Sequence, residues 1–153
     1  MHRYVQGSVA NPAAGHDLAD IPNYGDTFRL LTFRARLATS AVVANRVPHF
    51  RFVSPSGNVI HEVVPSAVQA ASLTVTYDLV GGSGAANEGS AVSDGVSSLC
   101  LPDFWFPAGT TLETATTALD VGDTWSAVYW SAIVGEEWEH LRLLTEIASQ
   151  IGG

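Results

Sequence analysis

Two histidines are the residues of this sequence whose type and spacing best suit a metal ion. His49 and His61 lie on the two arms of an expected β-hairpin, and imidazole is a common zinc ligand. The nearest carboxylate, Glu62, is expected to point to the opposite face, because side chains alternate along a strand. Two histidines without a third ligand do not form a zinc site. We therefore expect structural roles for both histidines and no bound metal.

Two aspartates could offer carboxylates to a calcium ion. Asp120 and Asp123 stand in the sequence Asp-Val-Gly-Asp. Calcium takes about six to eight oxygen ligands, far more than this pair supplies. Asp and Gly are also the residues that tight turns select for backbone reasons. The pattern therefore predicts a turn between two strands and no calcium site.

The compact motifs of common enzyme classes are absent from the sequence. It contains no G-x-S-x-G nucleophile elbow, Walker loop, G-x-G-x-x-G fingerprint or H-E-x-x-H zinc motif. A small β-sandwich enzyme with a dispersed active site is the remaining enzymatic alternative, and it requires titratable side chains that converge in a pocket. The sequence shows no such set, so we expect a protein that is not an enzyme and uses no cofactor.

The composition excludes several classes of partner. The chain has 153 residues, a formal net charge of −8 and seven basic residues, all of them arginines. This acidic balance argues against a nucleic acid held through phosphate contacts. No apolar run approaches the roughly 20 residues that span a bilayer, so no membrane partner is expected. Cys100 is the only cysteine, which excludes an intramolecular disulfide and predicts a packed, inert thiol.

Short segments of alternating apolar and polar residues occupy the middle of the chain. The clearest is a hairpin whose turn is Ser54-Pro55-Ser56-Gly57. In the last segment, Trp125, Ala127 and Tyr129 are expected on one face. Strands joined by turn signals at near-regular spacing predict an all-β, antiparallel β-sandwich or jelly-roll-like domain over residues 27–135. The expected strands are Thr27–Leu37, Arg46–Val53, Asn58–Val64, Ala71–Leu79, Ser97–Leu101, Thr110–Thr117 and Thr124–Val134.

Three segments lack this alternation. Residues 1–26 contain Gly and Pro without a sustained period, and we expect an extended N-terminal arm that docks on a partner. Val80–Gly95 is rich in Gly, Ser and Ala and is expected to be a mobile surface loop. Residues 136–153 carry apolar residues at helical spacing and predict a short amphipathic C-terminal helix. That helix packs either on the sandwich or on a neighbouring subunit.

An aromatic cluster, Phe104-Trp105-Phe106, stands between two prolines. Strand alternation sends Trp105 to the side opposite Phe104 and Phe106, so one side of the cluster is expected to face outward. Such a side chain fills a partner's pocket or stacks on a sugar ring, and we favour the subunit contact. The arm, the cluster and the helix supply the residues expected to contact partners: Tyr4, Val5, Val9, Leu18, Ile21, Tyr24, Phe104, Trp105, Phe106, Trp138, Leu141 and Leu144.

Two long segments resemble auxiliary virion proteins of tailed phages. One runs from Pro107 to Trp138 and reads PAGTTLETATTALDVGDTWSAVYWSAIVGEEW. The other runs from Phe28 to Glu62 and combines an apolar strand, a Thr/Ser/Ala-rich bend, an Arg-bearing strand and an SGNV hairpin. The resemblance implies a jelly-roll-like capsid decoration or cement protein. It further implies symmetric assembly, often as a homotrimer, on the lattice of the major capsid protein, and hence a place on the capsid surface of a virion assembled in the bacterial cytoplasm.

The function expected from these features is mechanical. The arm and the terminal helix bury apolar surface on neighbouring subunits and link capsomers through many identical weak contacts. The alternative from another class is a receptor- or carbohydrate-binding module of a phage tail or head fibre. In that case Trp105, Trp130 or Tyr129 serves as the stacking platform. The fold alone does not separate the two functions.

Overall fold

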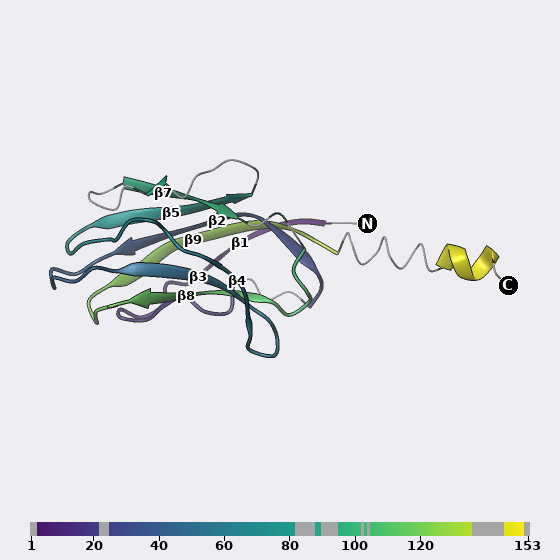
Figure 1. Cartoon of the computed structure of the whole chain (residues 1–153), viewed down its shortest axis with the longest axis horizontal. Helices are drawn as coiled ribbons and strands as arrows, with labels where there is room; N and C mark the ends of the chain where they lie inside the picture. Colours follow the sequence, from purple (N-terminus) through teal and green to yellow (C-terminus); the bar gives the residue numbers. More distant parts are fainter. Residues whose placement is uncertain are drawn as a thin grey trace.

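The computed structural model describes residues 3–21, 25–81, 88–89, 95–101, 103, 105–135 and 146–151. Within them, the strands form a six-stranded sheet in the order β1-β9-β2-β5-β7-β6 and a three-stranded sheet in the order β4-β3-β8. The two sheets pack face to face, which confirms the all-β sandwich (Figure 1). The strands are β1 Arg3–Val9, β2 Phe28–Ala38, β3 Val47–Val53, β4 Val59–Val63, β5 Thr74–Gly81, β6 Glu88–Gly89, β7 Gly95–Leu101, β8 Thr111–Thr117 and β9 Thr124–Val134.

The alternation along each strand decides which side chains enter the core. In β2, Phe33, Ala35 and Leu37 are buried, whereas the arginines between them are exposed. In β5, Val75, Tyr77 and Leu79 are buried in the same way. Burying one face of each sheet against the other removes both apolar faces from water, which is the main favourable term in folding.

A bulge in β9 changes the outer face of the larger sheet. The pairing of β2 with β9 shifts register between Arg34 and Arg36, next to Ala127, which has a φ of 50°. An extra residue at a bulge inverts the alternation beyond it. Trp125 is therefore buried while Tyr129 is 57% exposed, and the prediction that they share a face is wrong.

One pair among the described strands is parallel. β5 and β7 run in the same direction, with Val75 beside Gly95 and Gly81 beside Leu101, so the larger sheet is mixed and not purely antiparallel. A parallel pair needs a long connection to return the chain to its starting edge. The Gly/Ser/Ala-rich segment supplies that connection. Val80, Gly81, Glu88, Gly89 and Gly95 belong to strands, and the rest of Val80–Gly95 lies outside the described residues.

The first part of the chain belongs to the sandwich, which corrects the expected arm over 1–26. Arg3–Val9 pairs with β9 along its whole length, from Arg3 beside Val134 to Val9 beside Val128. Farther along, Ile21 exchanges backbone hydrogen bonds with Leu112, and Thr114 donates to the Leu18 carbonyl at 3.0 Å. Residues 17–21 therefore cover the free edge of β8, where an unpaired strand edge would otherwise invite other chains.

Aromatic rings fill the core in two groups. Phe52 stacks on Phe106 with ring centroids 4.3 Å apart, and Phe106 stacks on Phe28 at 5.3 Å. Phe50 contacts Trp125 edge-on at 6.1 Å, and both rings touch Tyr77. Buried aromatic pairs of this kind contribute beyond their area alone. Burial also raises the pKa of the Tyr77 hydroxyl, which donates to Gln69 at 2.9 Å.

Residues 146–151 are helical, within the C-terminal helix expected over 136–153. Their side chains are exposed, including Ile147 and Ile151 at 51% and 81%. Trp138, Leu141 and Leu144, the proposed contact residues of this helix, lie outside the described residues. No helix in the described part of the chain has the length and apolar character needed to cross a membrane.

Candidate functional site

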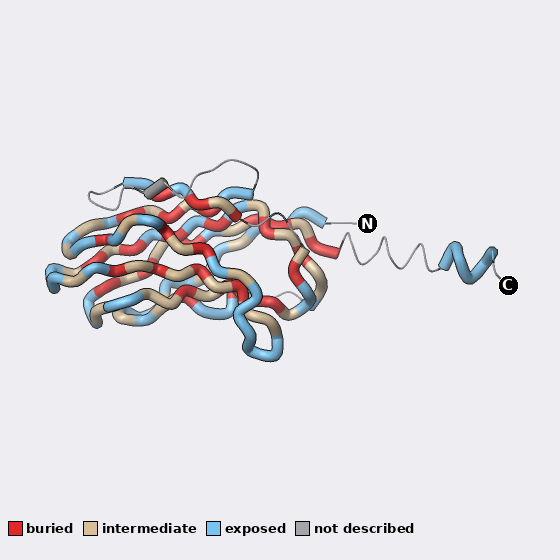
Figure 2. Tube along the Cα trace, in the orientation of Figure 1, coloured by how far each residue is buried: buried red, intermediate tan, exposed pale blue. Residues whose placement is uncertain are grey.

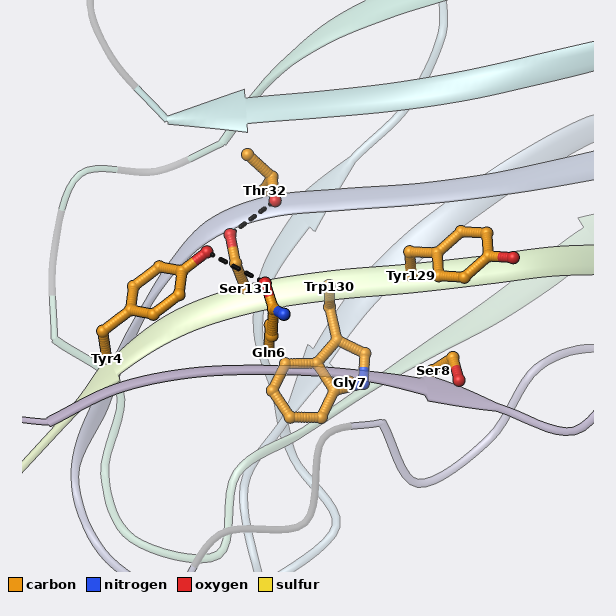
Figure 3. Close-up of a pocket in the computed structure, with 8 residues that line it drawn as sticks. All are labelled: Tyr4, Gln6, Gly7, Ser8, Thr32, Tyr129, Trp130 and Ser131. Atoms are coloured by element: carbon orange, nitrogen blue, oxygen red, sulfur yellow. Dashed lines mark hydrogen bonds between the residues drawn. The ribbon is translucent and has the colours of Figure 1, made fainter.

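A groove of about 560 Å³ runs over the outer face of the six-stranded sheet. Its walls come from β1, β9 and β2, as Figure 3 shows. The register places Gln6 beside Ser131 and Ser131 beside Thr32, so one row of polar side chains crosses all three strands. Ser8 lies beside Tyr129 in the next row. The groove is therefore built on the centre and edge of a rigid sheet.

Two exposed tyrosines mark the groove. Tyr4 is 59% exposed and Tyr129 57% exposed, although each ring is large and mostly apolar. The polar side chains between them are already ordered: the Thr32 and Ser131 hydroxyls are 2.6 Å apart, and the Tyr4 hydroxyl donates to the Gln6 amide oxygen at 3.4 Å. The groove thus offers hydroxyl and amide groups between two aromatic faces.

Trp130 holds the floor of the groove in place. Its indole ring packs across Gly7, its neighbour on β1, and against the core. A Cβ atom at position 7 would lie only 2.5 Å from the indole Cζ2 atom. No other residue type fits at position 7 without moving the ring, which explains a glycine inside this strand.

A second candidate surface is the loop tip, which we define as Ala13, Ala14, Ala41, Val42, Val43, Ala70 and Val121. All seven residues are exposed, with Val43 at 93% and Val121 at 84%. They come from the four loops at one end of the sandwich, opposite the end where β1 begins and β9 finishes (Figures 1 and 2). Exposed apolar residues gathered at one end of a domain are typical of a protein contact.

A buried ion pair braces the loop tip. The Arg46 and Asp123 side chains are both 0% exposed, with Arg46 Nε 2.9 Å from one carboxylate oxygen and Nη2 3.1 Å from the other. Arg46 Nη1 also donates to the carbonyls of Val42 and Ala44 at 2.7 and 2.9 Å. One guanidinium therefore fixes the backbone that carries two of the exposed valines.

The other loops join the same network. Asp123 accepts from the backbone amides of Ser40 and Asp120 at 2.8 and 2.9 Å, and its own carbonyl accepts from Gly15 at 2.8 Å. The Ser40 carbonyl accepts from the Ser72 amide at 2.9 Å. All four loops of the tip are thereby connected through hydrogen bonds to one buried centre.

The carboxylates of this network are held in their charged form. Burial alone would raise the pKa of Asp123, but the Arg46 hydrogen bonds and two backbone amides outweigh burial and lower that pKa below its usual range. Asp120 accepts from the Gly122 amide at 3.0 Å and the Ser40 hydroxyl at 2.8 Å. These two hydrogen bonds, the amide first, lower the pKa of Asp120 as well.

The structure shows where the residues considered and rejected as metal ligands lie. His49 and His61 lie on opposite faces of the hairpin, because His61 pairs with Phe52 and contacts its ring. Glu62, expected on the far side, shares the face of His49: it lies 2.8 Å from His49 Nδ1 and 2.9 Å from Arg51 Nε. Asp120 and Asp123 form the expected turn. Among the described residues, no three acidic, histidine or cysteine side chains gather as metal ligands.

Several expected contact residues are buried and cannot meet a partner. Leu18, Ile21 and Phe106 are 3%, 1% and 0% exposed, because each packs inside the sandwich. Val5 and Val9 are half-buried against the core. Tyr4 is exposed. Trp105 is half-buried, whereas the next residue, Phe106, is fully buried. Tyr24 and Phe104 lie outside the described residues. Among the described residues of the expected set, only Tyr4 enters either candidate surface.

Sequence reasoning missed the residues that form the loop tip. A signal was present, because Ala41-Val42-Val43-Ala44 is an apolar run in a loop, where polar residues are usual. The groove residues Gln6, Thr32 and Ser131 gave no signal, since their meeting depends on which strands are neighbours. Comparison with protein-family models, curated proteins and solved structures finds no match for this chain.

Proposed function

We propose that this protein is a structural subunit that decorates the capsid of a tailed phage and docks on the major capsid protein through the loop tip. The observation that supports docking there is the combination of exposed valines with a buried brace. Val42, Val43 and Val121 offer apolar surface, and the Arg46–Asp123 pair holds their loops in one conformation. A binding surface that is already ordered loses less conformational entropy on association.

The chemistry of the tip fits a protein partner. The seven residues that define it are alanines and valines, and the Arg46 and Asp123 charges that brace it are buried and paired. Apolar contact surface of this kind excludes water from a protein interface and gives little attraction for a phosphate backbone. The net charge of −8 also opposes nucleic acid.

The capsid lattice is proposed from the resemblance of the two long segments to phage decoration proteins. A lattice presents many identical sites, so a weak apolar contact at each copy adds up to firm attachment when the subunits are linked as a homo-oligomer, with a trimer favoured. The end of the sandwich opposite the tip, where β1 begins, is then free to face away from the capsid (Figure 1). In this arrangement the protein acts by adding contacts and not by catalysis.

Co-sedimentation with capsids tests the proposal. Capsids of the source phage that lack this protein are mixed with wild type, with Val43→Ser/Val121→Ser, or with the control Val59→Ser/Val96→Ser. The control valines are 49% and 55% exposed and lie on strands outside the tip. We expect the tip variant to lose at least about tenfold in affinity, which is about 1.4 kcal/mol, and the control to bind normally.

Equal binding by both variants would remove the loop tip from the proposal. Quantitative mass spectrometry of purified particles tests whether the chain is part of the capsid. A copy number near that of the major capsid protein supports decoration. Absence of the chain from particles contradicts it.

A further inference from the structure

We propose that the groove on the outer face of the six-stranded sheet binds a neutral oligosaccharide, with Tyr4 and Tyr129 as stacking platforms. This site is separate from the loop tip and goes beyond the proposed attachment to a capsid. Of the three platforms suggested by the sequence it keeps Tyr129 alone, because Trp130 packs beneath the groove across Gly7 and Trp105 is not part of the lining.

The lining has the chemistry of a sugar site. It combines two tyrosine rings with the hydroxyls of Ser8, Thr32 and Ser131 and the amide of Gln6, and none of its residues is charged. A sugar ring has apolar faces, which pack on an aromatic ring, and hydroxyl groups at its rim, which need hydrogen-bond partners. A phosphorylated or acidic ligand would find no cation in the lining. The groove therefore favours an uncharged, hydroxyl-rich ligand.

The separation of the tyrosines indicates the length of the ligand. Tyr4 lies beside Ile133 and Tyr129 lies beside Ser8, so the two rings are offset by four residues along antiparallel strands. At about 3.3 Å per residue, this offset corresponds to roughly 13 Å. A single sugar ring does not reach both tyrosines, whereas an oligosaccharide lying along β1 and β9 does.

The site is also ordered before any ligand arrives. All three contributing strands are hydrogen-bonded neighbours in one sheet, and the Thr32 and Ser131 hydroxyls already contact each other at 2.6 Å. The indole of Trp130 packs between Gly7 and the core and holds this part of the groove in place. A rigid groove with few polar groups in fixed positions is the usual form of a small-ligand site.

Isothermal titration calorimetry tests the site directly. Wild-type protein is titrated with maltohexaose, cellohexaose and chitohexaose, and the best of these is titrated into Tyr129→Ala, Tyr129→Phe and the control Val80→Ala. Val80 is 42% exposed on the same sheet but is not in the groove. We expect Tyr129→Ala to bind at least about tenfold more weakly, a loss in the range of one aromatic stacking contact. Tyr129→Phe and Val80→Ala should stay within about twofold of wild type.

Several outcomes would overturn the proposal. Absence of heat with all three neutral hexasaccharides, followed by binding only to acidic glycans on an array, would contradict the neutral site. Binding that survives Tyr129→Ala would place the sugar elsewhere. A second copy of the chain is the other candidate occupant of the groove, and sedimentation equilibrium tests for it. A dimer that dissociates in Tyr4→Ala would assign the groove to that second copy. Capsid co-sedimentation of the same variants is expected to be normal, so failure here is distinguishable from failure of the capsid proposal.

Discussion

Two arginine–aspartate pairs in this protein have the same separation and opposite surroundings. Arg46 and Asp123 lie 2.9 Å apart inside the loop tip, and both side chains are 0% exposed. Arg34 and Asp78 also lie 2.9 Å apart, on the outer face of the six-stranded sheet, with side chains 54% and 22% exposed. In water the second pair gains little, because solvent screens the charges and competes for their hydrogen bonds. Separation alone therefore says little about the contribution of an ion pair.

The buried pair matters because neither partner can return to water. Its guanidinium and carboxylate have further partners in the loop backbones, so each charge is satisfied only while the whole network is complete. Removing one partner leaves a charge buried without compensation. The apolar tip thus depends on a polar centre, whereas the sheet face needs no such support from its exposed pair.

The largest effect is expected from Asp123→Asn, which removes one charge of the buried pair. Breaking a buried pair on one side costs about 3–5 kcal/mol, because Arg46 stays buried without a counter-charge. Urea denaturation followed by tryptophan fluorescence measures the free energy of unfolding. A loss below about 1 kcal/mol would show that water or local rearrangement satisfies Arg46, and the comparison with the exposed pair would fail.

A smaller loss is expected from Gly7→Ala beneath the groove. The added methyl group would overlap the Trp130 ring, and overpacking of this kind typically costs about 1–3 kcal/mol. Gly25→Ala is the matched control, because a Cβ atom there meets nothing within 4 Å. Thermal unfolding monitored by circular dichroism compares the two variants. Equal melting temperatures would mean that Trp130 moves without cost and does not fix the floor of the groove.

Acid should remove the stabilisation that the carboxylates of the loop-tip network contribute. The pKa values of Asp123 and Asp120 are lowered in the folded protein, so the folded state binds fewer protons than the unfolded state near pH 4. Their stabilisation is complete above the usual carboxyl pKa of about 4 and is lost as the pH falls through the lowered values. Denaturation between pH 7 and pH 3 measures this decline. The decline of stability with falling pH should be shallower in Asp123→Asn. An unchanged slope would contradict the assignment of this decline to the loop-tip carboxylates.

The smallest effect is expected from Asp78→Asn. Exposed ion pairs contribute about 0–1 kcal/mol, so the free energy of unfolding should change by less than about 1 kcal/mol. The same urea titration provides the measurement. A loss as large as that of Asp123→Asn would refute the view that burial, and not separation, decides what each pair contributes.

The strands that alternate strictly could be predicted from the sequence. β2, β3, β4, β5, β8 and β9 lie within a few residues of their expected ranges, because period-two patterning reports which face is buried. β1 escaped prediction for a local reason. Gly7 interrupts the apolar side of Arg3–Val9, and its purpose is visible only once Trp130 is seen against it.

Features that join distant residues could not be predicted. Arg46 and Asp123 are 77 positions apart, and each alone resembles an ordinary polar residue beside a turn. Tyr129 was assigned to the wrong face because a bulge at Ala127 leaves no mark in the apolar pattern. The groove needs β1, β9 and β2 as neighbours, and neighbouring strands so far apart in sequence are decided by the whole fold.

The order of strands in the larger sheet has a consequence for synthesis. β9, which leaves the ribosome after the other described strands, lies between β1 and β2, which are made much earlier. Until residue 134 has emerged, the edges of β1 and β2 that pair with β9 have no partner strand. Long-range pairing of this kind is slow and exposes the chain to aggregation. We therefore expect the domain to fold only after translation has passed β9, and a stalled or truncated chain to depend on chaperones.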